Sequence, residues 1–138
     1  MISKTEIRVR GYHLDVYGHV NNARYLEFLE EARWDLFEGH VDLEQWKGLG
    51  LAFFVANISI NYRRPASLGD VLEIRTGLTR FGNKSATFSQ RIVLKGTETL
   101  LADAEITFVL ADMNTGKAVP IEGELRALFE PFCEKSPC

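Results

Sequence analysis

The chain has 138 residues, of which 46% are hydrophobic and 25% charged, and these values fit one globular domain. A formal net charge of −3 at pH 7 argues against a general nucleic-acid or membrane-surface binder. No apolar run approaches the roughly 20 residues that a membrane span needs. The first residues, M-I-S-K-T-E-I-R, lack the hydrophobic run of a signal peptide, so we expect a cytoplasmic protein.

The first predicted strand covers Thr5 to Gly11, where apolar and charged residues alternate. A loop with the sequence D-V-Y-G-H-V-N-N follows, and a long helix runs from there to about Glu38. We expect Asn21 or Asn22 as its N-cap and Gly39 as its C-terminal stop. Its apolar stripe is widened by Leu26, Phe28, Trp34 and Phe37, so the helix should be buried over most of its circumference. A short second helix is predicted over residues 41–47.

From Leu51 onward the apolar residues recur with the period of a β-strand. One face of the strand over residues 52–62 should hold Ala52, Phe54, Ala56, Ile58, Ile60 and Tyr62. Three more strands follow over about 72–79, 86–94 and 100–110, then a short strand before Pro120 and a helix over 122–132. Strands joined by hairpins form antiparallel sheets. We therefore predict an α+β fold in which about five antiparallel strands wrap around one long central helix.

The two cysteines, Cys133 and Cys138, both lie near the C-terminus. This pair is neither a disulfide framework nor a metal-binding spacing, and it suits a reducing cytosol. No histidine stands beside them at a fixed spacing, so we do not expect thiol chemistry. We predict one domain over residues 1–132 and a short tail over 133–138.

The loop before the long helix carries the clearest chemical signal, because it places an acid, Asp15, just ahead of a helix N-terminus. Free backbone N–H groups at a helix start stabilise negative charge. A carboxylate beside them can act as a general base or as a nucleophile. A loop acid that only stabilises a turn is the plainer alternative.

The order of elements and the motif D-V-Y-G-H-V-N-N-A-R-Y-L-E-F resemble the hotdog-fold acyl-CoA thioesterases of the 4-hydroxybenzoyl-CoA thioesterase type. Together with two further segments, I-N-Y-R-R-P-A and E-G-E-L-R, this motif makes the chain look like the group of the bacterial long-chain acyl-CoA thioesterase III over residues 6–128. The resemblance implies that Asp15 is the catalytic carboxylate and that the N–H near Asn22 polarises the thioester carbonyl. It also implies a homodimer or homotetramer with interfacial sites and no metal or cofactor, since CoA is part of the substrate.

Further candidates for substrate binding each have a plainer alternative. His19 and Asn21 lie in the loop and could contact substrate or only hold the loop. A polar wall at a subunit interface, or a solvent-facing strand, would explain Asn57, Ser59 and Asn61. Phosphate binding or simple solvation would explain Arg63, Arg64 and Lys84. An acyl channel, or ordinary core packing, would explain Phe53, Phe54 and Phe81.

We therefore predict an acyl-CoA thioesterase that releases a free acid and CoA, with long fatty acyl chains as the first expectation and aromatic acyl groups as the second. One alternative is a hotdog dehydratase of hydroxyacyl thioesters, which would need His19 to pair with a helix carboxylate such as Glu27 or Glu31. The other is a non-catalytic acyl-CoA-binding module, which would bind thioesters without turnover.

Overall fold

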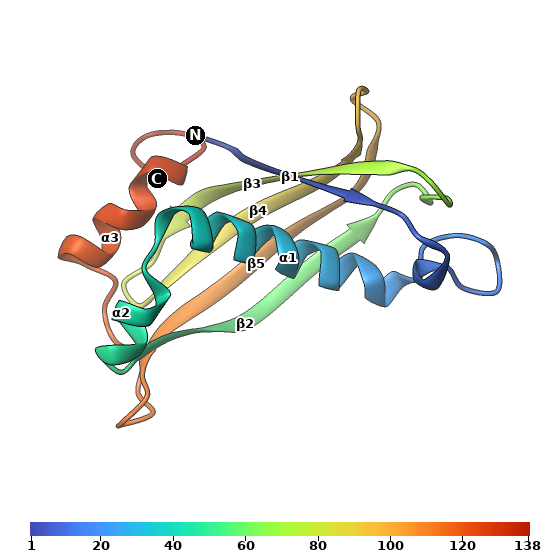
Figure 1. The fold of residues 1–138 in the computed structure, drawn as a ribbon. Coiled ribbons are helices and arrows are strands. Elements are labelled where there is room, and N and C mark those ends of the chain that lie inside the picture. The colour runs from blue at the N-terminus through green and yellow to red at the C-terminus, as the bar shows by residue number, and fades with distance from the viewer.

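The computed structural model describes all residues 1–138 and confirms the predicted α+β arrangement (Figure 1). One antiparallel sheet of five strands has the order β1-β3-β4-β5-β2, and it curves around the long helix α1. In chain order the elements are β1 (Ser3–Arg8), the 3-10 turn η1 (Gly11–His13), α1 (Asn22–His40), α2 (Leu43–Gly48), β2 (Leu51–Tyr62), β3 (Val71–Phe81), β4 (Ser85–Leu94), β5 (Leu100–Asp112), α3 (Gly123–Phe129) and the 3-10 turn η2 (Glu130–Phe132).

Helix α1 begins where the sequence predicts. The side chain of its N-cap, Asn21, accepts a hydrogen bond from the backbone N–H of Ala23 at 2.9 Å. Its C-terminal end differs from the prediction, because Gly39 lies inside the last turn and the helix continues to His40. The stop is Val41, whose extended backbone turns the chain away from the helix axis. Gly39 is therefore not needed as a left-handed cap.

The three inner strands keep the predicted alternation, and their core faces are closed by α1. Alternate side chains of β3, β4 and β5 are buried: Leu72, Ile74, Thr76 and Leu78; Ala86, Phe88, Gln90 and Ile92; Ala102, Ala104, Ile106, Phe108 and Leu110. A buried polar network ties α1 to this face, since Arg33 donates to Gln90 Oε1 at 2.9 Å. Gln90 in turn donates to the carbonyl of Leu29 and to Thr76, each at 3.0 Å. The network satisfies polar groups that would otherwise be costly to bury.

Strand β2 departs from the predicted face. A β-bulge between Val55 and Asn57 adds one residue, Ala56, and reverses which side chains point inward. Phe53 lies opposite buried Leu110 and packs in the core, whereas Phe54 is on the outer face and 47% exposed. The prediction that Ala52 to Tyr62 keep one alternation was therefore wrong for the first half of the strand.

The prediction that α1 is buried over most of its circumference was also wrong. Leu26 and Trp34 are 38% and 48% exposed, although they belong to the predicted apolar stripe. The helix packs mainly over β3 and β1. It contacts β2 toward its two ends, through Tyr25 against Tyr62 and Phe37 against Phe53. Leu26 and Trp34 lie between these contacts along the helix and stay exposed.

Smaller differences concern the ends of the chain. The first strand begins and ends two to three residues earlier than predicted, and the short strand before Pro120 is reduced to one bridge between Ala111 and Ala118. The C-terminal helix divides into α3 and η2. The two cysteines, expected to be unpaired, form a disulfide because the chain after η2 folds back upon Cys133, which packs in the hydrophobic core.

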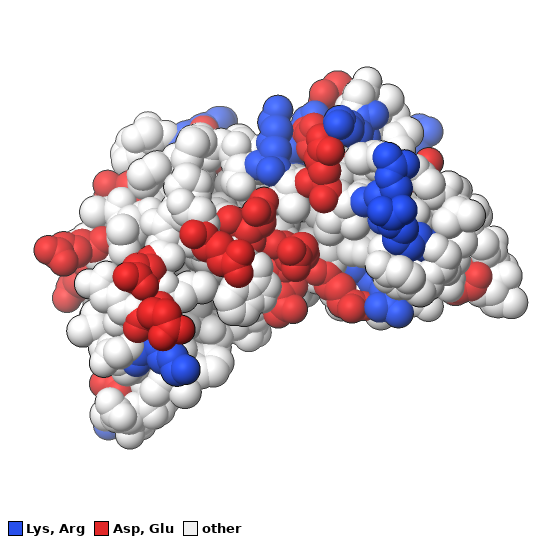
Figure 2. All heavy atoms as spheres, viewed as in Figure 1, with Lys and Arg blue, Asp and Glu red and all other residues white.

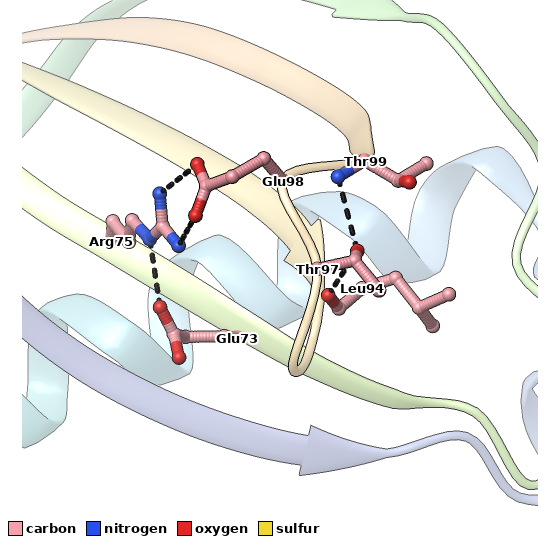
Figure 3. A network of polar contacts seen from close by, with 6 residues as sticks. All are labelled: Glu73, Arg75, Leu94, Thr97, Glu98 and Thr99. Carbon is pink, nitrogen blue, oxygen red and sulfur yellow. Dashed lines mark hydrogen bonds and ion pairs between the residues drawn. The ribbon is translucent and has the colours of Figure 1, made fainter.

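The β4–β5 hairpin is held on the outer face of the sheet by a charged network (Figure 3). Arg75 on β3 bonds Glu73 through Nε at 2.7 Å and Glu98 through both terminal nitrogens at 3.0 and 3.1 Å. The Arg75 guanidinium lowers the pKa of Glu98, which sits at the hairpin tip. Within the turn, Thr97 donates to the Leu94 carbonyl and accepts from the N–H of Thr99.

Candidate active site

The loop ahead of α1 fixes Asp15 by local hydrogen bonds. Its Oδ1 accepts from the backbone N–H of Tyr17 at 2.9 Å, and its carbonyl accepts from Gly18 at 3.0 Å. Gly18 has φ of +78°, a conformation that favours glycine, so the tight turn depends on it. Antiparallel bridges from Leu14 to Val20 and from His19 to Ser67 close the base of the loop. Asp15 is thereby held half-buried with one carboxylate oxygen bonded within the turn.

The start of α1 presents a backbone donor beside that loop. Because the Asn21 side chain bonds the N–H of Ala23, it does not take the N–H of Asn22. Asn22 is the first helical residue and has no helical partner for its N–H. The hydroxyl of Tyr62 at the end of β2 donates to the Asn22 carbonyl at 3.1 Å. The helix start is thus anchored to the sheet with one N–H group available at its end.

Asp15 and Asn22 share one cleft of about 320 Å³, which we call the α1 cleft. Of the residues predicted as site residues, it brings together Asp15, His19, Asn22, Arg63 and Arg64. Its remaining lining residues are Tyr17, Val20, Tyr25, Tyr62 and Pro65. A carboxylate, a helix N-terminus and two guanidinium groups around one cleft can bind an anionic ester-like substrate and attack its carbonyl.

Other predicted site residues lie outside the α1 cleft of the same chain. Asn57, Ser59 and Asn61 lie opposite Thr107, Glu105 and Asp103, on the sheet face away from α1. Lys84 lies in the β3–β4 hairpin, at the end of the molecule remote from the Asp15 loop (Figure 1). Asn21 caps the helix and lines a separate cavity of about 400 Å³, which we call the flanking cavity.

Two further residues, His13 and Arg24, line the flanking cavity. His13 is 7% exposed, accepts from the N–H of Arg10 at 2.9 Å and packs edge-on against Phe28. Burial lowers the pKa of His13, and the charge of Arg24 adds to the effect. Arg24, which opposes the helix dipole, pairs with Glu27 one turn along at 3.0 Å. A dehydratase pairing of His19 with Glu27 finds no support, because the two residues line different cavities.

Positive charge gathers at the end of the molecule that carries the α1 cleft. Figure 2 shows basic side chains over the region where β1 ends and α1 begins, while acidic side chains cover the exposed side of α1. Within the cleft, Arg63 Nε bonds Asp103 at 2.7 Å, and this contact lowers the pKa of Asp103. Arg64 is exposed and forms no ion pair, so its guanidinium is available to a ligand.

The family is decided by a comparison of the whole chain with known proteins. Residues 9–129 match the model of the thioesterase-like superfamily. The chain belongs to this superfamily. The long-chain acyl-CoA thioesterase FadM of Escherichia coli is 54% identical over 92% of this chain and 96% of its own length. The acyl-CoA thioester hydrolase YbgC, also from Escherichia coli, is 36% identical over 77% of this chain and 79% of its own length.

Among solved structures, YbaW from Escherichia coli superimposes with a TM-score of 0.87 at 54% identity, covering 96% of this chain and 99% of that chain. The resemblance to hotdog thioesterases stated from the sequence is therefore confirmed, as is the fold. These comparisons assign no roles to Asp15 or Asn22, and the structure shows only that both residues line the α1 cleft.

A second feature of this superfamily member was not found by sequence reasoning. A cavity of about 590 Å³, which we call the apolar cavity, lies between α1, α2 and β2, and 12 of its 17 lining residues are hydrophobic. Of the three phenylalanines considered for an acyl channel, only Phe53 lines it. Phe54 faces outward, and Phe81 packs under the guanidinium of Arg126 at 4.3 Å. The sequence feature that could have indicated this cavity is Trp34, a large apolar helix residue that lines it and is not covered by another element.

The structure holds no group of three or more His, Cys, Asp or Glu side chains placed to bind a metal ion. None of its helices combines the length and the apolar character that crossing a membrane requires.

Proposed function

We propose that this chain hydrolyses long-chain acyl-CoA thioesters to fatty acid and CoA in the α1 cleft. The observation that carries the proposal is that Asp15, which has a carboxylate, and Asn22, the first residue of α1 with no helical partner for its N–H, line the same cleft. Thioester hydrolysis needs both, because an attacking group and a stabilised carbonyl oxygen must meet at one carbon. The long-chain preference follows FadM, the relative with 54% identity.

In this mechanism the thioester carbonyl oxygen accepts from the Asn22 N–H, which stabilises the negative charge of the tetrahedral intermediate. Asp15 acts in one of two ways. As a general base it removes a proton from water, whose oxygen bonds to the carbonyl carbon. As a nucleophile it attacks that carbon directly and forms an anhydride that water then hydrolyses. In both cases the C–S bond breaks and the CoA thiolate leaves and takes up a proton.

The CoA part of the substrate carries phosphates, and Arg64 is the first candidate to bind them because it is exposed and unpaired at the cleft. Arg63 shares its guanidinium with Asp103 and contributes less. Lys84 lies at the far end of the same chain, so it can take part only from a second subunit. We propose a homodimer or homotetramer, with Asn57, Ser59 and Asn61 at or near the interface because they lie on the edge strand β2.

We propose the cytoplasm as the place of action, where a Cys133–Cys138 bond would be reduced to two thiols.

The test is release of free CoA from acyl-CoA thioesters of short, long and aromatic acyl groups. Asp15→Asn removes the carboxylate charge with little change in shape, and we expect kcat to fall at least about 100-fold. Asp42→Asn is the matched control, because Asp42 caps α2 through its side chain and asparagine caps equally well. Unchanged CoA release by Asp15→Asn would remove Asp15 from the mechanism, and absence of release by the unaltered chain would overturn the function.

A further inference from the structure

The apolar cavity contains a buried cation. It lies where the C-terminal half of α1, the short helix α2 and the start of β2 meet (Figure 1), and 12 of its 17 lining residues are hydrophobic. Arg33 is one of the remaining lining residues, and it is only 8% exposed. A buried charge is costly unless it is paired and hydrogen-bonded. The partners of this guanidinium therefore decide what the cavity can bind.

The Arg33 guanidinium has one hydrogen bond and no ion pair within the chain. Its Nη1 donates to the neutral amide of Gln90 at 2.9 Å, and none of the ion pairs of the structure includes Arg33. No fully buried side-chain nitrogen lacks a partner. The Nε and Nη2 groups, which have no hydrogen bond, therefore reach open space, and Arg33 lines the apolar cavity.

The free edge of this guanidinium has the geometry that a carboxylate requires. Nε and Nη2 lie on the same edge of the planar group, and their parallel N–H groups match the two oxygens of a carboxylate. Gln90 holds the guanidinium in place, because its own amide nitrogen donates to the Leu29 carbonyl and to Thr76 Oγ1, each at 3.0 Å. A donor pair that is already oriented loses little freedom when a ligand binds.

The other charged residues at the cavity do not neutralise Arg33. Glu30 lies one turn earlier on α1, is exposed and forms no ion pair with it. Burial lowers the pKa of Arg33 and the charge of Glu30 opposes this with a smaller effect, but an arginine stays protonated in proteins. Lys47 on α2 is a second cation at the cavity. The lining thus carries two positive charges and one negative charge.

The rest of the cavity suits an alkyl chain. Its volume of about 590 Å³ falls within the range of ordinary ligand pockets. Aromatic and aliphatic side chains form most of the wall, among them Trp34, Phe37, Leu43 and Phe53. Each methylene moved from water into such a cavity favours binding about fourfold. A ligand that matches both the wall and the cation has a long apolar tail and one anionic end.

We propose that the apolar cavity binds a free long-chain fatty acid, with the carboxylate on the Nε and Nη2 edge of Arg33 and the alkyl chain among the hydrophobic lining residues. This inference goes beyond the proposed function, which concerns a thioester at the α1 cleft. A thioester carbonyl carries no charge and does not pair with a guanidinium as a carboxylate does. The separation along α1 from Asn22 to Arg33 is about 17 Å at helical rise, so the two sites are distinct within one chain.

The experiment compares an acid and an alcohol of the same chain length, dodecanoate and 1-dodecanol, below the concentrations at which they aggregate. The chain has two tryptophans, Trp34 and Trp46, and both line the cavity, so tryptophan fluorescence reports its occupation. Isothermal titration calorimetry gives the two dissociation constants. We expect dodecanoate to bind at least about 10-fold more tightly than dodecanol, because hydrogen bonds to charged groups are the stronger ones. Hexanoate should bind at least about 100-fold more weakly than dodecanoate.

Arg33→Met removes the charge and keeps an apolar stem of similar length. We expect the preference for dodecanoate over dodecanol to fall to about one, with little change in the affinity for dodecanol. Arg33→Lys, which keeps the charge but not the fork, should retain part of the preference. Arg91→Met is the matched control, because it removes the same charge from an exposed position on β4 outside the cavity. This control should keep the full preference.

Glu30→Gln tests the charge balance from the opposite direction. Removing the carboxylate at the cavity should raise the affinity for dodecanoate up to about fivefold and leave that for dodecanol unchanged. Glu31→Gln is its control, since Glu31 is exposed on α1 but does not line the cavity. A weaker affinity of Glu30→Gln for dodecanoate would contradict a carboxylate at Arg33.

Arg33→Met leaves Gln90 Oε1 without its donor, so folding is checked by circular dichroism. If this variant does not fold, Arg33→Gln takes its place, because glutamine is neutral and its amide can still donate to Gln90. The same loss of preference is expected for it.

The outcomes separate this inference from the proposed function. The inference is overturned if the unaltered chain does not bind dodecanoate, binds acid and alcohol equally, or keeps its preference in the folded neutral variant. Asp15→Asn should lose CoA release and still bind dodecanoate like the unaltered chain. Loss of dodecanoate binding in Asp15→Asn would place the carboxylate at the α1 cleft and overturn the inference. An unaltered chain that releases no CoA overturns only the function.

Discussion

Strands β4 and β2 have the same kind of alternating sequence, but their inward side chains differ in burial. In β4, which pairs with β3 and β5, the inward residues Phe88 and Ile92 are fully buried. In β2, which pairs only with β5, the inward Ile58 is still 37% exposed. Alternation tells which residues share a face, but neighbouring elements decide whether that face is covered. The strand that its own chain leaves uncovered is the one where a partner or a substrate is expected.

The strongest test of this difference between β4 and β2 places the same substitution, isoleucine to lysine, in both strands. Ile92→Lys places a charge at a site with 0% exposure, a cost comparable with the whole stability of a domain, about 5–15 kcal/mol. We expect it to abolish the cooperative thermal transition seen by circular dichroism. Ile58→Lys should keep that transition and instead favour monomers in light scattering, since charge is costly only where a second chain covers it. An unfolded Ile58→Lys variant would contradict the view that β2 has an open inner face.

A second pair of variants tests the bulge at Ala56. Phe53→Ala should lower the free energy of unfolding by about 3 kcal/mol, because Phe53 packs on Trp46, Phe108 and Phe129. Phe54→Ala should lower it by less than about 1 kcal/mol, because Phe54 is 47% exposed on the outer face. Urea unfolding measures both. A larger loss of stability for Phe54→Ala than for Phe53→Ala would mean that Phe54 is the inward residue, as the unbroken alternation predicted from the sequence requires.

The smallest expected effect concerns the polar network under α1. Gln90→Leu removes the acceptor of buried Arg33 and should lower the free energy of unfolding by about 2 kcal/mol. Gln45→Leu, on the exposed side of α2, should change it by no more than about 0.5 kcal/mol. Urea unfolding of both variants makes the comparison, and equal effects would mean that the network contributes nothing measurable.

The candidate site was predicted in part. Asp15, Asn22, His19, Arg63 and Arg64 line one cleft because the loop before α1 and the end of β2 meet there. The contribution of Tyr62 was missed, since the sequence places it in a strand and does not reveal that its hydroxyl reaches the Asn22 carbonyl. Asn57 and Lys84 have polar or charged side chains that suit substrate binding. Nothing local in the sequence shows that Asn57 lies on the sheet face away from α1, or that Lys84 lies at the end of the molecule remote from the Asp15 loop.

The sequence by itself determined the inner strands, the long helix and its asparagine cap, because period and capping are local properties of the chain. It also placed the acid beside the helix start, since Asp15 and Asn22 are only seven residues apart. Only the tertiary structure decided the bulge that turns Phe53 inward, the free edge of β2 and the apolar cavity behind it. These features depend on which elements lie side by side, and contacts between residues distant in sequence are not written in any local pattern.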